Sequence, residues 1–125
     1  MKLVLENDPK PDFRGVADLP EILEQVDGNY NSFAILEADN GHFMQTANYG
    51  DGYVIEKQLG SLDEHYEAVP QGADQGPKLK QFFWNRLFKP KPPSFFTLDD
   101  AVACFTAFMG EGSDPQNIQW RKMHL

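Results

Sequence analysis

The sequence is poor in cysteine and contains no long apolar run. Its one cysteine, Cys104, has no partner within the chain, so no intrachain disulfide can form and nothing indicates an oxidising compartment. No stretch approaches the ~20 apolar residues that a membrane-spanning helix needs, and the N-terminal residues lack the apolar core of a signal peptide. We therefore expect a cytoplasmic protein that has no membrane partner.

The sequence also lacks the short motifs that mark common catalytic and cofactor sites. It has no phosphate-binding loop, no Gly-x-Gly-x-x-Gly and no Gly-x-Ser-x-Gly. His42, His65 and His124 are scattered without metal-ligand spacing, so we expect structural or solvent-exposed histidines and no metal. Cys104 lies among apolar residues of a predicted helix, which favours a small buried side chain over a catalytic thiol. These absences predict a protein that is no enzyme and binds no cofactor.

Positive charge is scarce outside one segment. The 125 residues carry a net charge of −8. Residues 1 to 75 hold fifteen acids and four bases, whereas residues 76 to 96 hold five bases and no acids. Because an acidic surface repels nucleic acid and attracts basic proteins, we expect a protein partner and no nucleic acid.

Length and composition are those of one globular domain, residues 1–125. Residues 19 to 27 are predicted to form a short amphipathic helix, with Asp18 as its N-cap, Glu21 closing a capping box and Gly28 ending it. A clearer helix follows Thr97, which is placed to cap it together with Asp100. Its apolar stripe comprises Leu98, Ala101, Val102, Phe105, Phe108 and Met109, and Gly110 is placed to end it.

Alternating apolar and polar residues predict the strands. Residues 33–38, 42–49 and 53–59 are separated by Asn-Gly and Asp-Gly turns, and residues 65–69 form a fourth strand. A fifth strand is expected around Ile118 to Lys122. The predicted fold class is α+β, an antiparallel sheet of about five strands with two main helices packed on one face.

The acids of the third and fourth strands allow two interpretations. Glu56 is predicted to lie near Glu64 or Glu67 across the strand pair. Two close carboxylates can serve as acid and base because their pKa values split. The alternative is a solvated acidic sheet face, which we favour because no other polar groups are predicted to converge there.

A basic and aromatic insert occupies about residues 71–96. Basic residues interleaved with aromatics are typical of nucleic-acid stacking or of membrane-surface binding. The acidic body of the protein disfavours nucleic acid. A packed connecting helix, with its lysine ammonium groups in water, and a partner-binding segment both stay open for the insert.

Three stretches together resemble a known family: "HFMQTANYGDGYVIEKQLGSLDEHYEA", "TLDDAVACFTAFMGEG" and "IQW". The pattern is similar to the type-one immunity-protein family of bacterial polymorphic toxin systems, although the insert is longer than that pattern expects. The resemblance implies a small α+β domain that binds a cognate toxin domain and blocks it without catalysis. The matching positions are Tyr53, Val54, Glu56, Gly60, His65, Tyr66, Ala68, Leu98, Asp99, Ala101, Val102, Phe105, Phe108 and Trp120.

From charge and resemblance together we hypothesise a docking face for a basic toxin domain, on a chain that is a monomer or a homodimer. Acids would steer the partner, and aromatic side chains would anchor it. The alternatives are a small non-catalytic interaction or regulatory domain with another partner and, third, a ligand-binding domain or enzyme. The predicted partner-binding residues are Glu56, Asp63, Glu64 and Glu67, with Tyr53, Tyr66, Phe82 and Trp84 as anchors.

Overall fold

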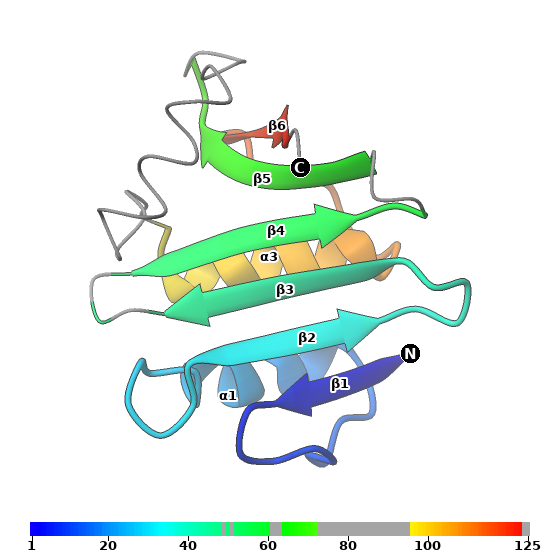
Figure 1. The fold of residues 1–125 in the computed structure, drawn as a ribbon, viewed down its shortest axis with the longest axis vertical. Coiled ribbons are helices and arrows are strands. Elements are labelled where there is room, and N and C mark those ends of the chain that lie inside the picture. The colour runs from blue at the N-terminus through cyan, green and yellow to red at the C-terminus, as the bar shows by residue number, and fades with distance from the viewer. Residues whose placement is uncertain (49, 51, 61–63, 73–95, 124–125) are drawn as a thin grey trace.

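The computed structural model describes residues 1–48, 50, 52–60, 64–72 and 96–123. Most of the insert at 71–96 therefore lies outside the described residues, as do Asp63, Phe82, Trp84 and His124. In the described part, six strands form one antiparallel sheet whose spatial order follows the chain (Figure 1). They are β1 (Lys2–Leu5), β2 (Phe33–Glu37), β3 (Phe43–Asn48), β4 (Tyr53–Gln58), β5 (His65–Pro70) and β6 (Ile118–Lys122).

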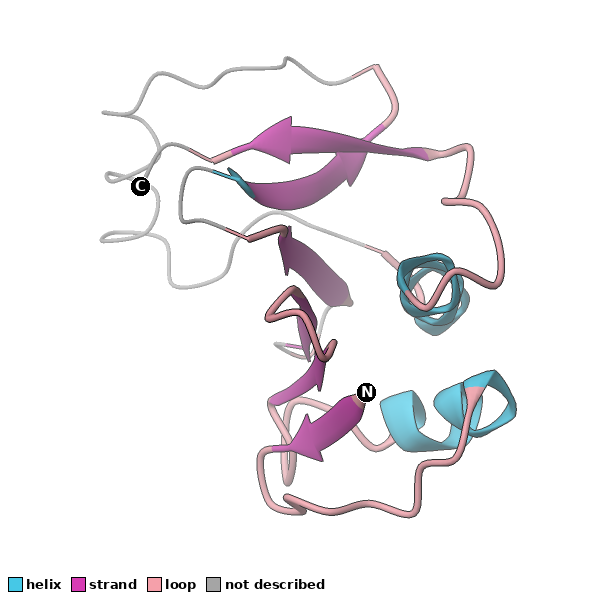
Figure 2. Ribbon diagram, turned by 90° about the vertical axis from the view of Figure 1, so that its right-hand side faces the viewer, coloured by secondary structure: helices cyan, strands magenta, loops and turns pink. Residues whose placement is uncertain are grey.

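Two helices lie on the same face of this sheet (Figure 2). Helix α1 (Leu19–Glu24) follows the 3-10 turn η1 (Val16–Asp18), and α3 (Leu98–Phe108) leads towards β6. The predicted α+β class is confirmed. The structure adds β1, which the sequence reading missed because four residues are too few for a clear alternation.

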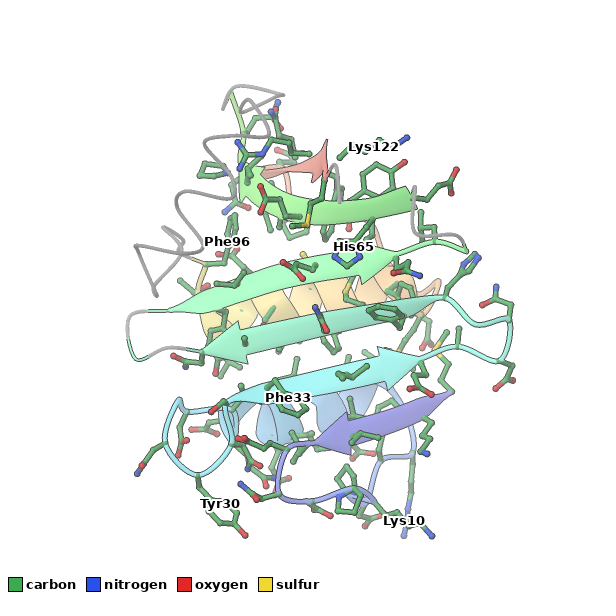
Figure 3. All side chains as sticks on the ribbon, viewed as in Figure 1. Lys10, Tyr30, Phe33, His65, Phe96 and Lys122 are labelled. Carbon is green, nitrogen blue, oxygen red and sulfur yellow. The ribbon has the colours of Figure 1, made fainter. Side chains whose placement is uncertain are left out.

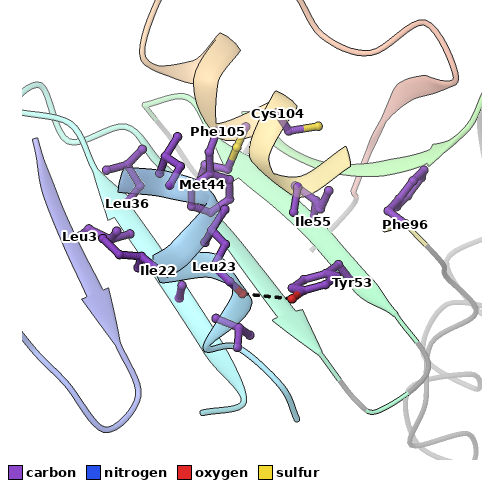
Figure 4. Packing of buried hydrophobic residues seen from close by; sticks show 14 of the residues in the cluster. Leu3, Ile22, Leu23, Leu36, Met44, Tyr53, Ile55, Phe96, Cys104 and Phe105 are labelled. Carbon is purple, nitrogen blue, oxygen red and sulfur yellow. Dashed lines mark hydrogen bonds between the residues drawn. The ribbon is translucent and has the colours of Figure 1, made fainter. Parts of the chain in front are cut away.

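The core lies between the helices and one face of the sheet (Figure 4). Alternating residues of each strand point into it, as Leu3 of β1, Leu36 of β2 and Ile55 of β4 do. Phe105 of α3 is fully buried among them. Full burial of one large apolar side chain stabilises a fold by about 1.5–3 kcal/mol, so this face provides most of the driving force for folding.

The predicted side-chain cap is present at the start of α3 but not at the start of α1. Thr97 accepts a hydrogen bond from the Asp100 backbone N–H at 3.2 Å, and Asp100 accepts one from the Thr97 N–H at 3.0 Å, so the predicted capping box is confirmed. The prediction that the Asp18 side chain caps α1 is wrong. Asp18 belongs to η1, and its carboxylate accepts the Arg14 N–H at 2.8 Å instead.

A turn after β1 pairs with the last residue of that strand at its outer edge. The Leu5 N–H donates to the Asp8 carbonyl at 2.9 Å, and the Asp8 N–H donates back to Leu5 at 3.4 Å. Pro9 and Pro11 follow in sequence and bring no N–H groups. The turn therefore occupies the outward-facing N–H and C=O groups of Leu5 at the end of the edge strand.

Candidate functional site

Polar side chains form a row across the sheet face opposite to α1 and α3, here called the second face. Gln45 of β3 pairs in register with Glu56 of β4, Glu56 with Glu67 of β5, and Glu67 with Arg121 of β6. The predicted proximity of Glu56 and Glu67 is thus observed. Because register partners share a face, four strands contribute one side chain each to this polar row.

Each carboxylate of the polar row is bound by its neighbours. The Gln45 Nε2 donates to Glu56 Oε2 at 2.6 Å. The Arg121 Nε donates to Glu67 Oε1 at 2.8 Å, and a second guanidinium nitrogen binds the same oxygen. Charge-assisted hydrogen bonds of this kind are stronger than neutral ones. The row therefore joins β3 to β4 and β5 to β6 through side chains as well as through the backbone.

His65 completes the row at the start of β5, where Figure 3 shows it over the second face. Its Nε2 lies 3.3 Å from Glu56 Oε2, and its Nδ1 lies 3.3 Å from Gln58 Oε1. The side chains of His65 and Glu56 are only 9% and 12% exposed. Both ring nitrogens of His65 thus face oxygen atoms of β4 side chains.

A histidine beside a carboxylate also occurs in acid–base catalysis, but this pair is poorly placed for it. A general base needs a ring nitrogen that reaches the substrate. Both nitrogens of His65 already face protein oxygens, and the Phe43 ring packs edge-on at 6.3 Å between centroids. The arrangement is suited to holding the strands together and gives no support to the catalytic interpretation of the acids.

The predicted docking residues do not assemble into one exposed face. Glu56 is buried and paired, and Glu67 is half-buried and bound to Arg121. Tyr66 is half-buried and lies on the opposite face of β5 from Glu67. Glu64, just before β5, keeps an exposed carboxylate. Asp63, Phe82 and Trp84 lie outside the described residues.

Tyr53 corrects the expectation of a surface anchor. Its ring lies in the core, only 8% of the residue is exposed, and its hydroxyl donates to the Leu23 carbonyl at 3.0 Å (Figure 4). Burial raises the pKa of this hydroxyl, so it stays a neutral donor. Tyr53 ties β4 to α1 and is not available to a partner without unfolding.

Sequence reasoning missed Lys57, which points to the helix side of β4. Its Nζ lies 4.1 Å from the centre of the Trp120 ring, a cation–π contact. The indole Nε1 of Trp120 donates to Asp114 at 2.9 Å, and burial lowers the pKa of Lys57. Because side chains alternate between the two faces of a strand, Lys57 lies on the same face as Ile55. This alternation could have identified the position of Lys57 from the sequence.

Cys104 is fully buried in α3, as predicted. Burial, followed by the negative charges of Asp114 and Asp100, raises the pKa of its thiol to about 12. Since a thiol reacts as the thiolate, labelling of the native protein at pH 8 should be at least ~100-fold slower than labelling in denaturant. Native and denatured rates with a maleimide would check this, and equal rates would contradict the burial of the thiol.

The surface of the described residues is strongly acidic. They comprise sixteen acids and six bases, a net charge of −10. Ion pairs join Asp12 to Arg14 and Asp39 to the N-terminal amine, besides those of the polar row. Other exposed acids form no ion pair with a described residue, and these include Glu21, Glu24, Glu64, Asp99 and Glu111.

Within the described ranges, no three or more His, Cys, Asp or Glu side chains come together as metal ligands would. Among the same residues, no helix combines the length and the apolar character needed to cross a membrane. Comparisons of the chain with known protein families, with curated proteins and with solved structures found no match. The functional conclusion therefore depends on the chain's own residues and geometry.

Proposed function

We propose that this chain is a binding protein that inhibits a basic partner protein, the activity implied by its resemblance to the type-one immunity-protein family. The observation that carries the proposal is the excess of exposed acids that no described base neutralises. A surface of one sign speeds the encounter with a partner of the opposite sign and disfavours other partners. Toxin domains that act on nucleic acid are themselves basic, so they fit this charge.

The polar row supports a binding role over a catalytic one. Its only histidine and both of its carboxylates are occupied by one another and by Gln45, Gln58 and Arg121. The buried thiol of Cys104 is no nucleophile at neutral pH, given a pKa of about 12. Inhibition by surface contact needs none of these groups to react.

The test is co-purification from the native host at low salt, followed by identification of the retained protein. We expect a basic protein that stops growth when it is expressed alone and is neutralised when this chain is expressed with it. Association with this partner should also depend on salt, because the attraction between exposed charges weakens as salt shortens the Debye length. Association should slow by about tenfold between 0.05 and 0.5 M salt.

Two other outcomes would count against inhibition. A retained protein that is harmless when expressed alone would favour a non-catalytic interaction domain with another partner. Measured turnover by the purified chain, lost on replacing His65, would favour an enzyme.

A further inference from the structure

Three segments meet at one end of the sheet, and Tyr30 stands at their tip. The segments are residues 6–8 after β1, residues 25–32 between α1 and β2, and the end of β3 with Asn48 and Gly50. Tyr30 is 66% exposed, the most exposed large apolar side chain in the described residues. In Figure 3 its ring points away from the body of the protein.

Side chains on both sides fix the backbone of Tyr30. Its N–H donates to Asp27 Oδ1 at 3.1 Å, and the neighbouring Asn29 N–H donates to the same oxygen at 2.8 Å. Its carbonyl accepts from the Asn7 side-chain amide. Because both backbone groups are held, only the two side-chain torsions of Tyr30 are left to be ordered on binding.

Asn31 joins residues 6–8 to the loop between α1 and β2. Only 3% of it is exposed; its Oδ1 accepts the Asn7 N–H at 2.9 Å, and its Nδ2 donates to the Gln25 carbonyl at 3.2 Å. The Gly28 N–H donates to the Asn31 carbonyl at 3.1 Å. Burying an amide destabilises a protein unless its hydrogen bonds are satisfied, and here they hold the loop in one conformation.

The surroundings of Tyr30 are acidic. The described residues of the three segments include Glu6, Asp8 and Asp27 and no base, and Glu24 is exposed at the end of the preceding helix. The phenol hydroxyl makes no hydrogen bond to the described protein. The tip therefore combines an accessible aromatic ring, a free hydroxyl and negative charge on a fixed backbone.

Asp27 gives a direct test of this loop. Hydrogen bonds from backbone N–H groups, that of Asn29 first, lower its pKa from 3.8. A lowered carboxylate pKa adds stability that is present above about pH 4 and is lost as the pH falls through the folded value. We expect the amide signals of Asn29 and Tyr30 in NMR spectra to titrate with a midpoint below 3.8. Asp27→Asn should abolish this titration, and a midpoint at or above 3.8 would contradict the hydrogen bonds.

We infer that Tyr30 anchors this chain to its partner, and that the complementary site is an apolar pocket rimmed by lysine or arginine on a basic protein. Tyrosines held in place beforehand are typical hot spots of protein interfaces, and surrounding charges act mostly on the association rate. The acids around Tyr30 would repel nucleic acid and anionic lipid, which leaves a basic protein as the matching class. The inference rests on the proposed function and identifies the surface around Tyr30 as the one that binds the partner.

The inference places docking at the opposite end of the sheet from Glu64. Tyr30 lies just before the start of β2, which runs antiparallel to its neighbours, and Glu64 precedes β5 next to the β4 end that carries Gln58. Glu24 and Glu64 are thus matched exposed acids at the two ends. Lysine at position 24 is also compatible with folding, since a positive charge suits the C-terminal end of α1.

The experiment measures binding of variants to the basic protein that co-purifies with the wild-type chain. Tyr30→Ala should raise Kd by about 10- to 100-fold, mainly through faster dissociation. Its thermal unfolding should match that of the wild type, because the ring is exposed. Glu24→Lys should slow association by about three- to tenfold at low salt, and Glu64→Lys should change it less than twofold.

The outcomes separate the inference from the proposed function. If the wild-type chain retains a basic protein and Tyr30→Ala binds it equally well, the inference is overturned and the proposed function stands. The same holds if Glu64→Lys slows association and Glu24→Lys does not. If the wild-type chain retains no basic protein, the proposed function fails, and the inference falls with it.

Discussion

Phe105→Ala is expected to lower the free energy of unfolding by about 3–5 kcal/mol, the usual cost of removing a large side chain from a closed core. Phe105 is fully buried in α3, between that helix and the sheet. Alanine at this position would leave a cavity bordered by residues that cannot all move inwards. Urea unfolding, with the transition slope compared between variants, measures the loss.

Phe108 provides the matched control on the same helix. It packs against the core but is only partly buried. Phe108→Ala should therefore cost clearly less, about 1–2 kcal/mol, because water already reaches part of the ring. Equal losses for the two variants would show that α3 does not pack with Phe105 at its centre.

Gly28→Ala should destabilise the protein by about 2–5 kcal/mol. Gly28 has a φ of +79°, and a Cβ atom there would lie 2.8 Å from the Asn48 carbonyl oxygen and 3.0 Å from the Gly50 nitrogen. An alanine in left-handed conformation costs about 1–2 kcal/mol by itself. The overlap with backbone atoms adds about 1–3 kcal/mol, since neither contact can be relieved by a side-chain rotation.

Gly41 separates these two effects. It has a φ of +91°, but a Cβ atom would meet nothing within 4 Å. Gly41→Ala should therefore show the conformational cost alone, and the difference between the variants measures the close approach of Gly28 to Asn48 and Gly50. Because that approach positions Tyr30, Gly28→Ala should also weaken partner binding. Equal destabilisation at both positions would contradict the close approach of Gly28 to these backbone atoms.

Local patterns predicted those parts of the fold that depend on neighbouring residues. The alternation in β4 separated Ile55 from Glu56 correctly, and the spacing of Thr97 and Asp100 identified the start of α3. Asp18 is a residue type that often caps helices and stands at the right position in the sequence. Its backbone, however, has the helical conformation of η1, and its side chain makes no capping hydrogen bond to α1. Such backbone geometry is not encoded in residue type alone.

The candidate site was harder to predict because its contacts cross the chain. Arg121 meets Glu67 from 54 residues away, and His65 meets Glu56 only because of the register across the β4–β5 connection. The assignment of Tyr53 as a surface anchor was wrong for a different reason. The alternation along β4 places Tyr53 on the same face as Ile55, which is the core face, so the predicted strand already argued against an exposed Tyr53.

The sheet order, identical to the order of the chain, has a consequence for how the protein forms. Each strand that leaves the ribosome finds the strand it pairs with already made, so the sheet can grow from β1 towards β6 while synthesis continues. The connections between β2 and β3, β3 and β4, and β4 and β5 are short, which keeps the entropy of loop closure small for these pairs and favours rapid folding. The docking of α3 beside α1 joins residues ~80 positions apart, and the pairing of β6 with β5 joins residues about 50 apart, so both steps must wait for most of the chain.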